Sequence, residues 1–151
     1  MAIDPEEDFE PLSDKLAEVG GELLVRALDL QAEGALEFAE QDEDGVTYAE
    51  KIEPAERRLD PALPARELAA KVRALNPHVG TYLVLSDGER LGVRRARAVD
   101  AELEPGRFEA WDDELLLGCR EGALRLEVVQ SPGGKPMPAG AYLRGHPLPS
   151  Q

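Results

Sequence analysis

Five short apolar or alternating stretches, separated by turn-forming residues, dominate the second half of this 151-residue chain. The clearest turn is Asp87-Gly88, because Asp-Gly between two apolar runs is the strongest short-range signal of a β-hairpin. The predicted strands are Thr81–Leu85, Arg90–Val99, Arg107–Trp111, Leu115–Cys119 and Ala123–Gln130. Short strands at a spacing of roughly ten residues predict a small antiparallel barrel, and an OB-like barrel fits five of them.

Helical and acidic segments precede the predicted barrel. Residues 8–33 favour one amphipathic helix, because leucine and valine recur at spacings of three and four residues and Gly34 can close its C-terminal end. Residues 34–62 have no sustained period and predict an extended linker with one strand-like segment, Val46-Thr47-Tyr48. We therefore expect a helix in residues 1–33, a linker in 34–62 and the barrel domain in 63–151.

Two short helices complete the predicted domain. A helix is expected to begin at Pro64 and to end at Asn76-Pro77. One or two further helical turns are expected at Ala139–Leu143. The predicted fold class is therefore mainly β with helices. It is a five-stranded antiparallel OB-like barrel, preceded by an amphipathic helix and an extended linker.

The net charge of minus 14 is unevenly distributed along the chain. Residues 1–60 contain 19 acidic and 5 basic residues, whereas residues 61–151 sum to zero. Within the neutral part, residues 61–98 carry a net charge of plus 4. The acidic average therefore does not exclude a local surface that binds a polyanion.

The second predicted strand gathers the basic residues. Its apolar residues before and after Arg94-Arg95 are in opposite phase, which indicates a β-bulge with one extra residue. The bulge restores one inward row: Leu91, Val93, Ala96 and Ala98. It also places Arg94, Arg95 and Arg97 together outside, near Arg90, while Lys135 follows on a glycine-rich loop. This basic group is compatible with a solvated strand face and with a polyanion surface.

No residue pattern in the chain predicts catalysis or a metal site. The single cysteine, Cys119, cannot form an intramolecular disulfide, and His78 and His146 stand beside prolines in loop-like positions. No apolar run approaches the ~18 residues of a membrane span, and the N-terminus lacks a signal-sequence pattern. We expect no catalytic residue, metal or cofactor within this chain, no membrane association and a cytoplasmic location.

Several ordered strings cover nearly the whole chain. Asp14–Gly20 (DKLAEVG), Gln41–Ile52 (QDEDGVTYAEKI) and Arg73–Pro77 (RALNP) come first. They are followed by Cys119–Leu124 (CREGAL), Val129-Gln130, Gly134-Lys135, Met137 and Leu143–Gly145 (LRG). Together these strings resemble the methionyl-tRNA formyltransferase family. The first resembles the last helix of its catalytic domain, and the others resemble its linker and C-terminal domain.

The resemblance implies an enzyme that moves a formyl group from 10-formyltetrahydrofolate to the methionine amino group on initiator tRNA. The family's catalytic residues and folate pocket belong to an N-terminal domain, which is missing here except for the helix at residues 8–33. The chain is thus expected to be inactive alone, to contact tRNA weakly through its OB-like domain and to partner with that catalytic domain. The expected tRNA-binding residues are Arg90, Arg94, Arg95, Arg97 and Lys135. The leucine stripe of residues 8–33 is expected to favour self-association of the fragment.

Departures from the family pattern keep two other functions open. His78 replaces a common tryptophan, Pro64 replaces a usual serine cap, and the neutral charge of residues 61–151 contrasts with a generally basic family module. One alternative is a packing domain that braces the catalytic domain and binds no nucleic acid. Another is the same domain in a related formyltransferase acting on a sugar nucleotide or on folate alone.

Overall fold

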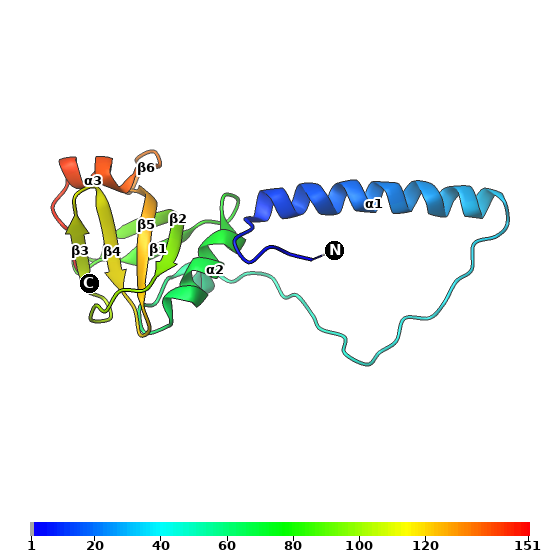
Figure 1. Ribbon diagram of the computed structural model, residues 1–151, viewed down its shortest axis with the longest axis horizontal. Coiled ribbons are helices and arrows are strands. Elements are labelled where there is room, and N and C mark those ends of the chain that lie inside the picture. Colours follow the sequence, from blue (N-terminus) through cyan, green and yellow to red (C-terminus); the bar gives the residue numbers. More distant parts are fainter. Residues whose placement is uncertain (1) are drawn as a thin grey trace. The chain divides into compact units, whose positions relative to one another are not determined.

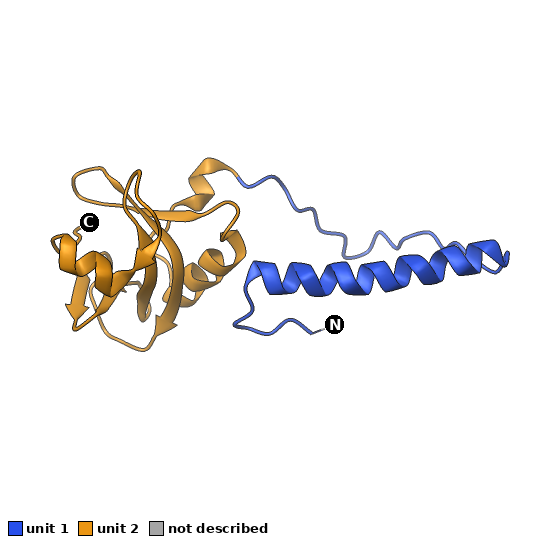
Figure 2. Ribbon diagram, turned by 90° about the horizontal axis from the view of Figure 1, so that it is seen from above, with its two compact units in different colours: residues 1–52 blue, residues 53–151 orange. Residues whose placement is uncertain are grey.

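The computed structural model describes residues 2–151, and the chain divides into two compact units with the boundary between Ile52 and Glu53 (Figure 2). The first unit contains α1 (Phe9–Ala32) and an extended segment. The helix ends in a Schellman motif, in which Gly34 has a φ of 68° and the Ala35 N–H donates to the Leu30 carbonyl at 2.9 Å. The predicted helix and its glycine cap are confirmed. No residue of α1 is buried.

The second unit begins before the predicted domain start at residue 63. Leu59 is fully buried, and its N–H donates to the Tyr82 carbonyl at 2.9 Å, next to a parallel bridge between Arg58 and Tyr82. A 3-10 helix, η1 (Pro54–Arg57), leads into this contact. A single buried side chain such as Leu59 produces no hydrophobic periodicity in the sequence. This explains why the segment before residue 63 was predicted to be a linker. The strand expected at Val46-Thr47-Tyr48 is absent, and these residues are exposed.

Six antiparallel strands form the sheet of the second unit (Figure 1). They are β1 (Thr81–Val84), β2 (Arg90–Val99), β3 (Phe108–Trp111), β4 (Glu114–Gly118), β5 (Ala123–Gln130) and the short β6 (Met137–Pro138). The order is β1-β2-β5-β4-β3, with β6 paired to β5. The five predicted strands are confirmed within one residue at each end. Strand pairing does not by itself close the sheet, because β1 and β3 stand at opposite ends of this order among the described residues.

Two helices flank this sheet. The buried face of α2 (Ala65–Leu75) carries Leu68, Val72 and Leu75, and this helix packs mainly on β2. The last helix, α3 (Ala139–Gly145), contacts β4, β5 and β6. The sheet contributes the other large buried side chains, among them Leu83, Leu91, Val93, Leu115, Leu117, Leu124, Leu126 and Val129. The domain is therefore a mixed structure of helices on an antiparallel sheet.

Candidate nucleic-acid interface

The pairing of β2 with β5 is irregular between Val93 and Ala96, at the place where the bulge was predicted, but β2 has no net extra residue there. Val93 pairs with Val129, Arg95 with Val128 and Ala96 with Leu126. Arg94 in β2 and Glu127 in β5 therefore both lack a strand partner, and the two shifts compensate each other. Leu91, Val93 and Ala96 are buried as expected. Ala98 lies on the same face but is exposed, because it lines a surface cleft beside Pro64 and Gly122.

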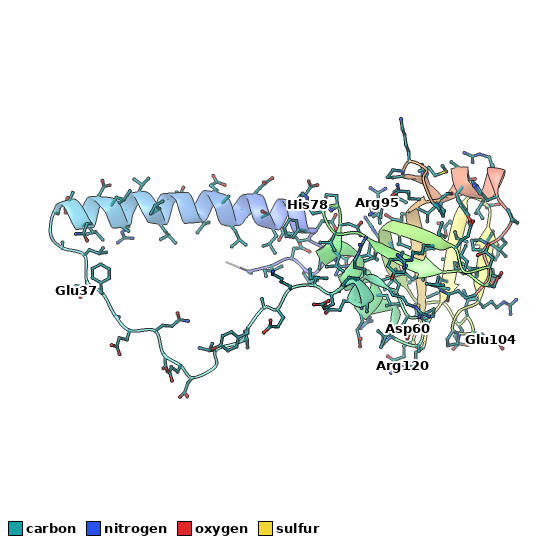
Figure 3. The ribbon with its side chains drawn as sticks, turned by 180° about the vertical axis from the view of Figure 1, so that it is seen from behind. Glu37, Asp60, His78, Arg95, Glu104 and Arg120 are labelled. Atoms are coloured by element: carbon teal, nitrogen blue, oxygen red, sulfur yellow. The ribbon has the colours of Figure 1, made fainter. Side chains whose placement is uncertain are left out.

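Arg95 and Arg97 lie on the solvent side of β2 and share one carboxylate. Arg95 Nε is 2.7 Å from Glu127 Oε2, and Arg97 Nε is 3.2 Å from Glu127 Oε1. Their side chains are 61% and 63% exposed, whereas that of Glu127 is 16% exposed. One carboxylate between two guanidinium groups leaves a positive charge that faces solvent. Figure 3 shows Arg95 at this surface of the domain.

A third guanidinium, that of Arg125, extends this cluster from β5. Its Nη2 lies 3.7 Å from Glu127 Oε1, and its Nη1 donates to Glu114 Oε1 at 2.9 Å. Arg97 pairs with Arg125 across the two strands, which places both side chains on one face. We call the five residues Arg95, Arg97, Arg125, Glu114 and Glu127 the arginine face. Its three guanidinium groups and two carboxylates leave one positive charge in excess.

Arg94 does not belong to the arginine face. Its Nε and Nη2 donate to Gln130 Oε1 at 2.8 and 2.5 Å, and its Nη1 lies 3.5 Å from Asn76 Oδ1. The side chain is half-buried between β5 and the end of α2. The expectation that Arg94 lies outside with Arg95 and Arg97 is therefore wrong, because this residue has no strand partner and its side chain contacts Gln130 and Asn76.

The other two predicted basic residues lie apart from these. Arg90 stacks over the Tyr82 ring, with its guanidinium carbon 4.5 Å from the ring centroid. Lys135 is exposed on the loop between β5 and β6. Of the five residues predicted from the sequence, the arginine face unites only Arg95 and Arg97. Arg125 was not among the predicted residues, although it alternates with Leu124 and Leu126, a pattern that indicates the solvent-facing side of a strand.

The side chains of Cys119 and His146, which could in principle take part in catalysis, are engaged in structural contacts. Burial raises the pKa of the Cys119 thiol to about 11, and its Sγ donates to the Leu117 carbonyl at 3.5 Å. The His146 ring stacks on Tyr142 at 4.2 Å between centroids. No three His, Cys, Asp or Glu side chains within residues 2–151 gather as metal ligands would, and none of the helices there has the length and apolar character to cross a membrane.

Comparisons with known proteins agree on one family. The family model for the formyl transferase C-terminal domain matches residues 51–147. A methionyl-tRNA formyltransferase of Methylobacillus flagellatus is 41% identical over 149 residues, which cover 98% of this chain and 48% of that protein. One of Nitrobacter hamburgensis is 41% identical over 140 residues, covering 91% of this chain and 44% of that protein.

A solved structure supports the fold. The crystal structure of HypX from Aquifex aeolicus matches with a TM-score of 0.73 and 19% sequence identity, over 96% of this chain and 27% of that one. At this identity the likeness concerns the fold alone. This chain spans about half the length of the curated relatives it matches.

Proposed function

Because the chain belongs to the formyl transferase C-terminal domain family, we propose that it is the accessory, noncatalytic part of a methionyl-tRNA formyltransferase and holds initiator tRNA. The whole protein would transfer a formyl group from 10-formyltetrahydrofolate to the methionine on that tRNA. The catalytic and folate-binding residues would belong to the catalytic domain, which we propose as the partner of this chain. Two relatives at 41% identity that carry this name support the proposal over a sugar-nucleotide or folate substrate.

The arginine face is the observation that carries the tRNA-binding part of the proposal. Arg95 and Arg97 are more than half exposed and share Glu127, so a phosphate group can approach them from solvent. Arginine is suited to phosphate because its planar fork of N–H donors matches two phosphate oxygens. Phosphate contacts position a nucleic acid without reading its sequence.

The charge of the second unit predicts weak binding. Residues 53–151 contain 14 basic and 15 acidic residues, so no long-range field attracts RNA to this unit. A phosphate must also compete with Glu127 and Glu114 for the guanidinium groups. We therefore propose local contacts that orient a tRNA held mainly by the catalytic domain.

Titration of the 151-residue chain with labelled initiator tRNA at several salt concentrations tests this function. Removing one phosphate contact should reduce the magnitude of the slope of log K against log salt by roughly 0.7 to 0.9. We expect this change for Arg95→Ala and for Arg97→Ala. Arg120→Ala is the matched control, because Arg120 is 56% exposed and lies in the turn between β4 and β5 (Figure 3). Equal slopes for all four proteins would exclude the arginine face as a tRNA contact.

A bracing role without nucleic-acid binding is the second candidate. The ion pairs of Arg95, Arg97 and Arg125 favour it, because each guanidinium already has a carboxylate partner. A protein that includes the catalytic domain separates the two roles. Under bracing, Arg95→Ala leaves tRNA affinity unchanged, and deletion of residues 53–151 lowers the thermal stability of the catalytic domain.

We also propose that the sheet curls into an OB-like barrel and that the protein is cytoplasmic. The support for curling comes from one cleft, whose walls include Val84 at the end of β1, Arg107 just before β3, and Gln151. The Ser86 N–H donates to the Ser150 carbonyl at 2.7 Å, so the C-terminal segment covers the end of β1. Both ends of the strand order thus line one region of the domain.

A further inference from the structure

Arg94 has an environment unlike that of the other arginines in β2. Its guanidinium contacts the side-chain oxygens of two amides, Gln130 and Asn76, and no carboxylate among residues 2–151 pairs with it. It is also half-buried, whereas Arg95 and Arg97 are exposed. A charged group that is partly removed from water needs hydrogen-bond partners on its buried side, and the two amide oxygens supply them.

Gly80 closes the third side of this environment. A Cβ at Gly80 would lie 2.0 Å from Arg94 Nη1, and Gly80 has a φ of 75°. The Gly80 carbonyl accepts a hydrogen bond from Arg57 Nε at 3.0 Å. The backbone thus leaves room for the guanidinium only because residue 80 is glycine.

Gln130 links Arg94 to the loop between β5 and β6 through its two side-chain hydrogen bonds. Its Oε1 accepts from Arg94, and its Nε2 donates to the Gly134 carbonyl at 2.7 Å. The Gly134 N–H in turn donates to the Ser131 carbonyl at 3.0 Å. We call residues 131–136 the Lys135 loop. A chain of hydrogen bonds therefore runs from Arg94 through Gln130 to the residue directly before Lys135.

A second anchor holds the beginning of this loop. Ser131 Oγ lies 3.4 Å from His146 Nε2, and His146 Nδ1 lies 3.1 Å from the Tyr142 carbonyl. The loop is thus tied to α3 at one end and to Arg94 at the other. Lys135 is exposed between the second tie and β6, where its ammonium group can meet an anion.

We propose that Arg94 is a positioning residue for the Lys135 loop. It acts through Gln130 to hold Lys135 where a phosphate of bound RNA can reach it, and it does not contact the RNA itself. This inference rests on the proposed tRNA-holding function and deepens it. It assigns Lys135 as a phosphate contact of the second unit, separate from the arginine face.

Hydrogen exchange of the 151-residue chain tests the positioning without RNA. Gln130→Glu keeps an oxygen partner for Arg94 but places an oxygen against the Gly134 carbonyl, so the tie to the loop is lost. We expect the amides of Ser131, Gly133, Gly134 and Lys135 to exchange about three to ten times faster in Gln130→Glu and in Arg94→Ala, as for the loss of one hydrogen bond. Arg97→Ala is the control from the same strand and should leave this exchange unchanged. Unchanged exchange in Gln130→Glu would overturn the proposal even if Arg94→Ala fails to fold.

A double-mutant cycle on tRNA affinity tests the other half. If Arg94 acts only through Lys135, the double variant Arg94→Ala/Lys135→Ala binds no more weakly than Lys135→Ala alone. Additive losses would mean that Arg94 contacts RNA directly and would overturn the proposal. If Lys135→Ala, Arg95→Ala and Arg97→Ala all bind tRNA as the parent chain does, the proposed function fails. The exchange result then still decides whether Arg94 positions the loop.

Discussion

At the scale of single residues, Glu127 determines how much positive charge the arginine face presents. It pairs with Arg95, Arg97 and Arg125 while being only 16% exposed. We predict that Glu127→Gln raises tRNA affinity and steepens its salt dependence, because three guanidinium groups lose their shared competitor. Glu102→Gln changes the net charge equally at an exposed site outside the arginine face and is the control. Equal gains in both variants would indicate an effect of overall charge alone.

Cys119 makes stability depend on pH in the alkaline range. Burial raises the pKa of this thiol from its ordinary value of 9.0 to about 11, so the folded protein holds the proton more tightly than the unfolded chain. Its contribution to the unfolding free energy is complete below pH 9 and is lost as the pH rises through 11. We predict a loss on the order of 2 kcal/mol across this range. Urea denaturation at several pH values measures it, and Cys119→Ala should lose less.

Tyr142 also contributes to the dependence of stability on alkaline pH. Its pKa is also raised, first by burial and then by the nearby charges of Asp87 and Glu89. Part of the alkaline loss therefore persists in Cys119→Ala. Identical pH profiles for the parent chain and Cys119→Ala would contradict the assignment to the thiol.

At the scale of elements, the turn between α2 and β1 depends on Gly80. We predict that Gly80→Ala destabilises the fold by more than the ~1 to 2 kcal/mol of a left-handed backbone alone, because the added Cβ meets Arg94 Nη1. Gly88→Ala is the matched control, since Gly88 has a φ of 84° but open space around it. Chemical denaturation of both variants measures the difference. Equal losses would show that the guanidinium moves away at no cost.

In helix α1, replacing a glycine by alanine should stabilise the structure instead of destabilising it. Gly20 and Gly21 lie in mid-helix with open space around them, so Gly20→Ala should stabilise the helix by about 1 kcal/mol. Gly34→Ala should weaken its C-terminal cap, because Gly34 has a φ of 68°. Circular dichroism at increasing temperature should therefore show more helix for the first variant and less for the second. The reverse order would contradict the capping geometry.

The elements were predictable from local signals, whereas the arginine face was not. The Asp87-Gly88 turn and the alternation of Leu124 and Leu126 are short-range patterns, and they located strands within a residue. The pairing of Arg95 with Glu127 depends on β2 lying beside β5, although β3 and β4 come between them in the chain. The direction of Arg94 depends on the same neighbour. The alternation of residues within one strand shows which side chains share a face, but it does not show which neighbouring strand supplies the carboxylate partner.

At the scale of the whole molecule, the two units differ in charge. Residues 1–52 carry 16 acidic and 3 basic residues, whereas the second unit is nearly neutral. The first unit also exposes apolar side chains along α1, among them Leu16, Val19, Leu23 and Leu28. An apolar stripe favours association, and a high like charge opposes it.

We predict that self-association of the chain through α1 strengthens with salt, which screens the repulsion between acidic units. Binding of tRNA should weaken with salt in the same range. Sedimentation at two salt concentrations measures the first effect, and Leu23→Ser should abolish it. A monomer at every salt concentration would rule out this role for the helix.

The paired irregularity between β2 and β5 also bears on how such a surface can change over generations. The register is the same on both sides of it, and each strand has one residue there without a strand partner, Arg94 in β2 and Glu127 in β5. Loss of a codon from one strand alone would slip the two strands by one residue and turn a buried row toward solvent. This surface can therefore change by exchange of side chains, whereas shortening one strand would disturb the interior.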